Sequence, residues 1–220
     1  MKSVQVEHVT RFGSKRIGFL KFTASIKNES GDTLSGSIFM RGPSVGILII
    51  LQPDDVKNRE EERHVILAMQ PRPAATSLRF LELPAGMVDD STFSGAAAKE
   101  IEEETGLIIK EKDLINLTEL AIEETNSQST AEDDLPRAMF PSAGGCDECI
   151  QLFLNEQRIP RKELEALRGK LTGLRDHGEK ITLKLVKFGD LWREGARDAK
   201  ALSALALYEN LKRAGKIGGS

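Results

Sequence analysis

The sequence predicts an α/β protein in which helices pack on a sheet, with a small β accessory piece at its beginning. Aliphatic runs of strand length occur together with amphipathic stretches of helix length, and no regular strand-helix-strand alternation is visible. The missing alternation favours an α/β sandwich over a doubly wound sheet. At 220 residues, the chain has room for one well-buried domain plus an appendage and is short for two full domains.

The first segment, residues 4–39, reads as short strands in which apolar and polar side chains alternate. One predicted face carries Leu20, Phe22, Ala24 and Ile26. We assign residues 1–41 to an accessory piece and residues 42–217 to the main domain. Because a small sheet buries little surface on its own, we expect this piece to pack on the main domain or on a second subunit.

The main domain opens with two aliphatic runs, residues 45–51 and 64–69, on either side of a charged stretch. They predict a buried strand hairpin with a solvated loop. A helix is expected over residues 93–105, with Ser91 or Thr92 as its N-cap and with Gly106 in the left-handed conformation after its end.

The remaining elements are weaker in pattern but can still be assigned. The polar stretch 123–137 has almost no aliphatic residues and predicts a mobile loop. Strands are expected at 107–109, 115–120, 150–154 and 181–186, and helices at 161–170 and 196–214.

Composition excludes several classes of protein. The net charge of -3 and the absence of a dense Lys/Arg patch argue against nucleic acid as a partner. No apolar run is long enough to span a bilayer, and the first residues lack the apolar core of a signal peptide, so no membrane association is expected. We therefore expect a cytoplasmic protein, with an organelle as the alternative location.

The two cysteines, Cys146 and Cys149, form a single C-x-x-C that could be a redox pair or half a zinc site. The three histidines of the chain are not at the spacing that would complete a zinc finger. We expect two reduced thiols beside a loop.

The most informative segment is the acidic end of the helix expected at 93–105. Residues three and four apart share a helix face, so Glu100, Glu103 and Glu104 should converge while Glu102 points elsewhere. Three carboxylates repel one another unless a cation lies among them, and hard oxygen ligands suit Mg²⁺ or Mn²⁺. Taken alone, an E-x-x-E-E pattern is more often a solvated helix face.

The neighbouring residues change this interpretation. Pro84-Ala85-Gly86 precedes the helix, a basic residue stands directly before Glu100, and Gly106 ends the segment. This pattern resembles the Nudix box, which runs Gly, five residues, Glu, seven residues, Arg-Glu-aliphatic, one residue, Glu-Glu, one residue, Gly-aliphatic. The chain departs from it twice, because Lys99 replaces the Arg and because the segment before Lys99 is one residue short, which puts Ser91 or Thr92 where the first Glu is expected. Asp89 or Asp90 could take over the supporting role of that Glu.

Further motifs are similar to the ADP-sugar diphosphatase branch of the family, which includes plant ADP-glucose/ADP-ribose diphosphatases and animal UDP-sugar relatives. The similar segments are residues 81–86, 39–42, 140–148, 172–179 and 190–192. The resemblance implies a Nudix α/β/α sandwich, a homodimer formed with the N-terminal β piece, and a nucleoside diphosphate sugar as substrate. It also implies Mg²⁺ ions, with Mn²⁺ as a substitute, held by Glu100, Glu104, the carbonyl of Ala85 and Glu103.

The implied reaction is attack of a metal-activated water on one phosphorus of the diphosphate. The candidates for the catalytic carboxylate are Glu103, Glu148 and Glu179, and His177 is an alternative base. Guanidinium groups suit phosphate, so we assign substrate binding to Arg72, Arg79 and Arg175, together with Glu82, although a surface ion pair is the commoner role of a single arginine.

Two other functions stay open at this point. The first is hydrolysis of a different diphosphate, such as UDP-glucose or NADH, because the preferred base and sugar depend on the shape of the pocket. The second is a catalytically weakened Nudix module that binds nucleotide sugars as a sensor, which the missing first Glu of the box suggests. A structural domain with an acidic helix would leave the spacing of Pro84-Ala85-Gly86 and Gly106 unexplained.

Overall fold

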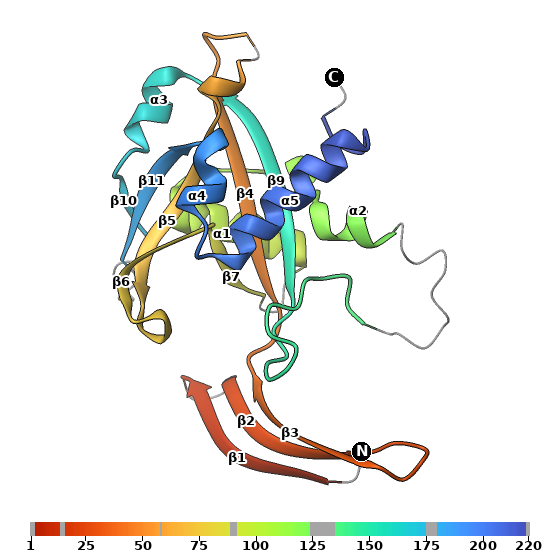
Figure 1. Cartoon of the computed structure of the whole chain (residues 1–220). Coiled ribbons are helices and arrows are strands. Elements are labelled where there is room, and N and C mark those ends of the chain that lie inside the picture. The colour runs from red at the N-terminus through yellow and green to blue at the C-terminus, as the bar shows by residue number, and fades with distance from the viewer. Residues whose placement is uncertain are drawn as a thin grey trace. The chain divides into compact units, whose positions relative to one another are not determined.

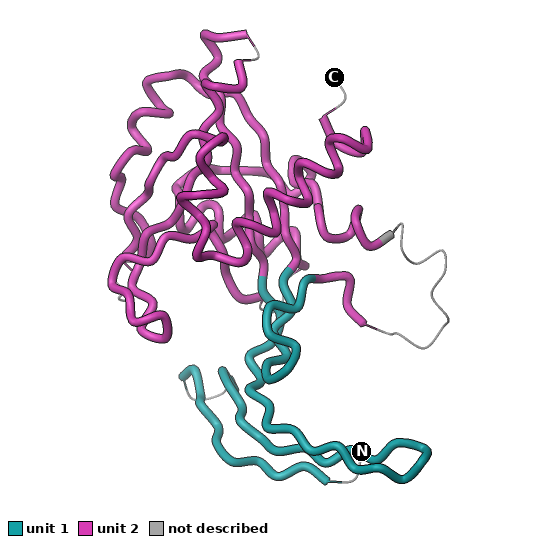
Figure 2. The backbone as a smooth tube through the Cα atoms, in the orientation of Figure 1, with its two compact units in different colours: residues 1–44, 139–150 teal, residues 45–138, 151–220 magenta. Residues whose placement is uncertain are grey.

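A computed structural model describes residues 3–13, 16–57, 59–88, 92–123, 135–174 and 180–218. Figure 1 shows the elements in chain order. The backbone forms two compact units (Figure 2): unit 1 contains residues 1–44 and 139–150, and unit 2 contains residues 45–138 and 151–220. The unit that contains the N-terminal strands therefore also takes in a segment from the middle of the chain.

Unit 1 contains a three-stranded antiparallel sheet formed by β1 (Ser3–Phe12), β2 (Arg16–Lys27) and β3 (Thr33–Met40). The turn between β2 and β3 is closed by Asn28, whose side chain accepts a hydrogen bond from the Asp32 backbone N–H at 2.8 Å. Gly31 has φ of +89° there, a conformation that few other residues adopt without strain. The β structure expected over residues 4–39 is confirmed.

The second part of unit 1, residues 139–150, is joined to the end of β3 and to Ser44, the first residue of β4 (Ser44–Pro53), by backbone hydrogen bonds. Phe39 donates its N–H to the Gly145 carbonyl at 2.8 Å, and Ser44 donates to the Cys149 carbonyl at 2.9 Å. The thiols of Cys146 and Cys149 are free, and burial raises the pKa of the Cys149 thiol, helped by the nearby carboxylates of Asp147 and Glu148.

Unit 2 is built on a mixed sheet with the strand order β10-β11-β5-β4-β9-β8, in which β6 also pairs with β5 and β7 with β4. The hairpin expected from the two aliphatic runs is confirmed, because Ile50 pairs with Val65 and Leu51 with His64. The strands are β4 (Ser44–Pro53), β5 (His64–Arg72), β6 (Ser77–Glu82), β7 (Ala85–Met87), β8 (Ile115–Asn116), β9 (Ile150–Ile159), β10 (Leu171–Thr172) and β11 (Ile181–Lys187).

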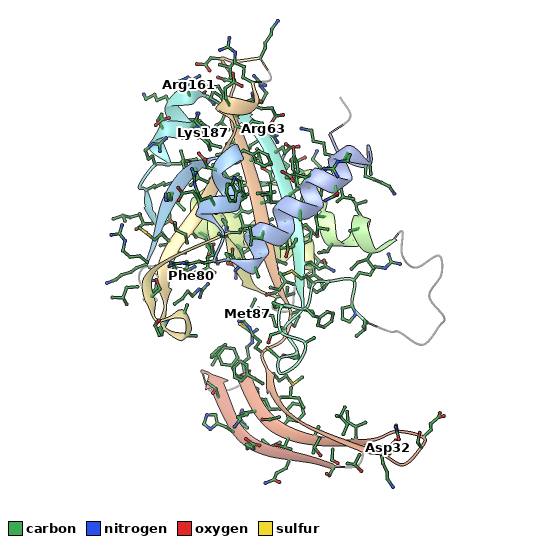
Figure 3. The ribbon with its side chains drawn as sticks, viewed as in Figure 1. Asp32, Arg63, Phe80, Met87, Arg161 and Lys187 are labelled. Atoms are coloured by element: carbon green, nitrogen blue, oxygen red, sulfur yellow. The ribbon has the colours of Figure 1, made fainter. Side chains whose placement is uncertain are left out.

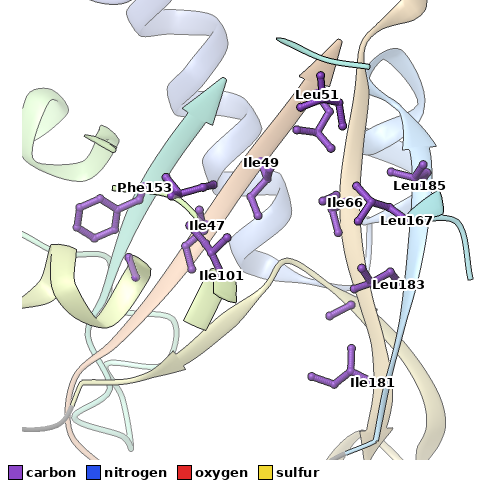
Figure 4. Packing of buried hydrophobic residues seen from close by; sticks show 14 of the residues in the cluster. Ile47, Ile49, Leu51, Ile66, Ile101, Phe153, Leu167, Ile181, Leu183 and Leu185 are labelled. Atoms are coloured by element: carbon purple, nitrogen blue, oxygen red, sulfur yellow. The ribbon is translucent and has the colours of Figure 1, made fainter. Parts of the chain in front are cut away.

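Helices cover both faces of this sheet. Alternate side chains of β4 point to opposite faces, and Ile47 and Ile49 pack with Ile101 of α1 (Phe93–Thr105) in one core cluster. Figure 4 shows Ile101 beside Ile47 and shows Leu167 close to Ile66. On the other face lie α4 (Leu191–Glu194) and α5 (Ala199–Arg213), with α5 crossing in front of β4 (Figure 1). The remaining helices are α2 (Leu117–Glu123) and α3 (Arg161–Ala166).

The predicted α/β class is confirmed, and so is the helix at 93–105 with both of its ends. One predicted strand is wrong and another is correct only at its start. Residues 107–109 form no strand, and residues 115–120 give only a two-residue strand before α2 begins at Leu117. Periodicity failed here because short apolar runs fit a buried helix turn as well as a strand.

Other predicted elements differ in length. The helix at 161–170 ends early, at Ala166, the C-terminal helix begins at Ala199, and the strand from Ile150 continues to Ile159. Most of the predicted mobile loop, residues 124–134, lies outside the described residues. Among the helices of the described ranges, none is both long and apolar enough to cross a bilayer.

Candidate active site

The candidate site lies in unit 2, where the turn between β6 and β7 meets α1. The Pro84 carbonyl accepts a hydrogen bond from the Ile47 N–H of β4 at 2.9 Å, which ties the turn to the central sheet. The next residue, Ala85, donates its N–H to Oε2 of Glu104 at 3.1 Å. The turn is thus fixed on one side by the sheet and on the other by a helix carboxylate.

Both ends of α1 are held by specific contacts. Thr92 caps the N-terminus by accepting a hydrogen bond from the Gly95 N–H at 3.0 Å, so the residue near the missing box Glu starts the helix. At the C-terminus, Thr172 donates its hydroxyl to the Glu104 carbonyl at 2.5 Å, and Gly173 donates its N–H to the Glu103 carbonyl at 3.3 Å. These contacts satisfy carbonyls that have no partner within the helix and fix its position.

Glu104 is the most enclosed of the acidic side chains, with only 2% of its surface exposed. Besides the Ala85 contact, its Oε1 accepts a hydrogen bond from the side-chain amide of Gln70 at 3.4 Å. A buried carboxylate is costly unless it is hydrogen-bonded or paired, so these contacts determine where both of its oxygens point.

Glu100 lies one helical turn before Glu104 and packs directly on β7. A Cβ at position 86 would overlap the carboxylate of Glu100, so any residue other than glycine would require that side chain to shift. The Gly86 of the motif therefore has a steric role, because it lets a charged side chain of α1 reach the backbone of β7.

The other two glutamates are less enclosed. Glu103 is half-buried, and its Oε1 lies 3.6 Å from Nζ of Lys99, whereas Glu102 is exposed. Burial thus follows the helix face that the spacing predicts. Within the described ranges, however, no three His, Cys, Asp or Glu side chains are close enough together to hold a metal ion.

Glu82, at the end of β6, is predicted to bind substrate, and the structure gives it two cationic partners. Its side chain is nearly inaccessible, with Oε1 accepting from Arg72 Nε at 2.6 Å and Oε2 from Lys200 Nζ at 3.1 Å. The Arg72 side chain keeps 43% of its surface exposed, so it has an accessible part beyond the Glu82 contact.

Other predicted site residues lie outside this cluster or outside the described residues. Arg79 is exposed on β6, and its backbone N–H donates a hydrogen bond to the Ser77 hydroxyl oxygen. Arg175 and Glu179 fall outside the described residues, and so do the alternatives His177, Asp89, Asp90 and Ser91.

Glu148 belongs to unit 1, where two of the segments singled out in the sequence, residues 39–42 and 140–148, meet. Its Oε1 accepts from the Ser44 hydroxyl at 3.2 Å and lies 3.3 Å from Arg41 Nη1. The preceding residue, Asp147, accepts hydrogen bonds from the backbone N–H groups of Arg41 at 2.7 Å and of Gly42 at 3.3 Å. The segments 39–42 and 140–148, which were distant in sequence, therefore form one local structure.

Sequence reasoning missed Gln70, Thr172, Asp198 and Lys200. Asp198 carried a usable signal, since an Asp directly before a helical pattern is a common N-cap, but the helix was expected to begin earlier. The roles of Gln70, Thr172 and Lys200 depend on which elements pack together, which the local sequence does not reveal.

The residue types around the turn fit a hard divalent cation. Two carboxylates of α1, those of Glu100 and Glu104, are directed at the short strand that carries Ala85 and Gly86, and carboxylate and carbonyl oxygens are the donors that Mg²⁺ prefers.

A mixed sheet between helices, with acidic residues of one helix packed on a Pro-Ala-Gly turn, is the arrangement expected of a Nudix domain. The family model of the NUDIX domain matches residues 40–203, and the chain belongs to this family. It is also similar to the protein called Nudix hydrolase 14, chloroplastic, of Arabidopsis thaliana, with 40% identity over 220 residues. The match covers 99% of this chain and 65% of that relative, so the chain spans about two thirds of its length.

Proposed function

We propose that the chain hydrolyses the diphosphate of nucleoside diphosphate sugars, with ADP-ribose and ADP-glucose as the first candidates. The observation that carries the proposal is the packing of Glu100 against Gly86, together with the hydrogen bond from Ala85 to Glu104. Family membership supports pyrophosphate hydrolysis in general, and the similarity of residues 81–86 to the ADP-sugar branch supports the narrower substrate class.

Mg²⁺, with Mn²⁺ as a substitute, would be held by Glu100, Glu104, the Ala85 carbonyl and Glu103. Such a cation would supply positive charge next to the diphosphate and would make the attacking water more acidic. Hydrolysis adds one water across the bond between one phosphorus and the bridging oxygen, and the products are a nucleoside monophosphate and a sugar phosphate.

The protein's own groups would orient the substrate and move a proton. Arg72 is the best-placed phosphate ligand, because its Nε is fixed by Glu82 while the side chain remains partly exposed. Arg79 and Arg175 remain further candidates. We keep Glu103, Glu148 and Glu179 as the possible proton acceptors; removal of Glu148 would also disturb Arg41 and Ser44.

We further propose that the chain is a homodimer formed through the sheet of unit 1. The strand register places apolar side chains on one face across all three strands: Val4, Val6 and Val9 on β1, Leu20, Phe22, Ala24 and Ile26 on β2, and Leu34, Ile38 and Met40 on β3. Several remain accessible, including Val6 at 55% and Leu34 at 71%. An apolar face of this kind is typical of a surface that a partner covers.

The predicted location, cytoplasm or an organelle, also remains a proposal. The relative in Arabidopsis thaliana is named as chloroplastic, which supports the organelle for this chain. Expression of the full-length protein with a fluorescent tag would decide between the two.

The substrate proposal is tested by incubating the purified protein with ADP-ribose, ADP-glucose, UDP-glucose and NADH, each with Mg²⁺ and with EDTA. We expect Mg²⁺-dependent release of AMP and a sugar phosphate, fastest from one of the two ADP-sugars. Faster cleavage of UDP-glucose or NADH would reassign the substrate. Thermal stabilisation by a nucleotide sugar without any turnover would replace the hydrolase with a sensor and direct attention to Thr92, near the missing box Glu.

A further inference from the structure

A buried group of charged side chains joins the first turn of α5 to the turn that carries Ala85. Asp198, the N-cap of α5, accepts from the Lys200 N–H at 3.1 Å through Oδ1 and from the Leu83 N–H at 2.8 Å through Oδ2. The Lys200 ammonium lies 3.0 Å from the same Oδ1 of Asp198 and 3.1 Å from Oε2 of Glu82. One ammonium thus bridges two carboxylates from different elements.

Lys200 is needed here for electrostatic reasons. The side chains of Glu82 and Asp198 are each only 4% exposed, and Lys200 is the cation that lies between them, although Glu82 also contacts Arg72. Without Lys200, the two buried carboxylates would repel each other. Burial on its own lowers the pKa of Lys200, but the two carboxylates outweigh it and the pKa is raised, so Lys200 stays charged.

The fold makes room for this side chain. A Cβ at position 46 would lie 3.2 Å from Cδ of Lys200, and the glycine there lets the aliphatic part of Lys200 pass close to β4. Lys200 therefore crosses from α5 past the central strand to the end of β6, where Glu82 lies.

These contacts hold three residues of the turn. Glu82 is held through its side chain by Lys200, Leu83 through its N–H by Asp198, and Ala85 through its N–H by Glu104. Asp198 and Lys200 therefore join the start of α5 to the turn by a backbone hydrogen bond and an ion pair, whereas Glu104 joins α1 to it.

We propose that Lys200 and Asp198 are positioning residues that fix the Ala85 carbonyl and Gly86 for the cation. The proposal rests on the proposed function, since it assigns these residues a role toward the metal without contact with it. Lys200 contacts the carboxylates of both Glu82 and Asp198, and Asp198 holds the backbone of Leu83. Loss of the ammonium should loosen the turn and weaken cation binding even where the fold is retained.

The test compares wild type with Lys200→Met and Asp198→Asn, using two measurements that need no turnover. Hydrogen exchange reports on the backbone N–H groups of residues 83–87 except Pro84, which has none, and calorimetric titration reports the affinity for Mn²⁺. The matched control is Arg63→Met, which removes another buried cation that contacts Glu60, Glu156 and the Tyr208 hydroxyl. Figure 3 shows Arg63 toward one end of unit 2 and Phe80 and Met87 toward the other.

We expect amide exchange at residues 83–87 to become at least about tenfold faster, and Mn²⁺ affinity to fall about tenfold or more, in Lys200→Met. Asp198→Asn should change both in the same direction, because the amide has only one accepting oxygen and cannot accept from Leu83 and from Lys200 at the same time. Arg63→Met should lower stability without faster exchange at residues 83–87 and without weaker Mn²⁺ binding. Where Lys200→Met fails to fold, Asp198→Asn decides the result.

Three outcomes would overturn the inference. Unchanged exchange at residues 83–87 in the folded variants would show that the turn does not depend on α5. If Arg63→Met loses as much exchange protection at residues 83–87 and as much Mn²⁺ affinity, the effect is one of general destabilisation. If wild type and the variants bind Mn²⁺ equally well, the positioning role is wrong but the proposed function is not affected. If wild-type protein neither binds Mn²⁺ nor hydrolyses a nucleotide sugar, the proposed function is wrong as well.

Discussion

The carboxylate of Glu100 occupies the space that a side chain at position 86 would need, and Gly86 is the residue that leaves this space open. The contact joins the middle of α1 to β7, two elements that are separated by the segment 88–92 in sequence. It gives a physical reason for the glycine of the motif, because a Cβ there would force the end of the Glu100 side chain out of its place against β7.

Substitution of Gly86 by alanine should therefore displace Glu100. We expect about a tenfold or larger loss of Mn²⁺ affinity, comparable to the loss of a group that orients a metal ligand. Titration calorimetry measures the loss, and Gly189→Ala is the control, since a Cβ at position 189 meets no atom within 4 Å. Equal affinity in the Gly86 variant would show that the position of Glu100 is unimportant for the cation.

Glu104→Gln should lower turnover at limiting Mg²⁺ by about a hundredfold, because an amide is a poor ligand for a hard cation but keeps an oxygen for the Ala85 N–H. The control is Glu102→Gln on the exposed side of the same helix. Steady-state rates over a range of Mg²⁺ concentrations make the comparison. Wild-type rates in Glu104→Gln would exclude Glu104 as a metal ligand.

His64 should make stability depend on pH. Burial lowers the pKa of His64 below the ordinary 6.5, and the charge of Lys187 acts in the same direction. The unfolded chain therefore binds the proton more readily than the folded chain, so stability falls as the pH decreases through 6.5 toward the lower folded pKa. Urea unfolding at about pH 7.5 and about pH 5.5 should show a smaller difference in His64→Gln than in wild type.

If the free energy of unfolding changes equally between the two pH values in wild type and in His64→Gln, the pH dependence belongs to other groups. The substitution keeps a polar side chain next to the Glu62 carbonyl, which His64 Nδ1 contacts at 2.9 Å. A general loss of stability in the variant would shift both free energies of unfolding and leave their difference interpretable.

The homodimer predicts that Val6→Asp dissociates the protein. Val6 lies on the apolar face of the β1-β2-β3 sheet and is 55% exposed, so a charge there costs the isolated chain little but disrupts a covered interface. Light scattering at micromolar concentration should give a dimer mass for wild type and a monomer mass for the variant. Ser37→Asp, on the opposite face of β3, should stay dimeric; a monomeric wild type would remove the dimer proposal.

Much of the fold followed from local pattern. The helix at 93–105 was predicted with both ends, because Thr92 caps by its own side chain and Gly106 adopts φ of +75°, and both properties belong to the residues themselves. The strands around Val45 and His64 were equally clear, since long aliphatic runs fit little except a buried sheet. The segment 115–120 failed because its few apolar residues fit strand and helix alike.

For the candidate site, too, some features follow from the local sequence and others only from the packing of distant elements. The sequence by itself determined which residues could hold a cation, because carboxylates at helical spacing share a face whatever lies around them. Only the tertiary structure decided that Glu100 packs on Gly86, that Glu82 is bound by Arg72 and Lys200, and that Asp198 holds the Leu83 backbone. These contacts join residues as far as 118 positions apart, and such pairings arise from the packing of whole elements, which no local run of residues specifies.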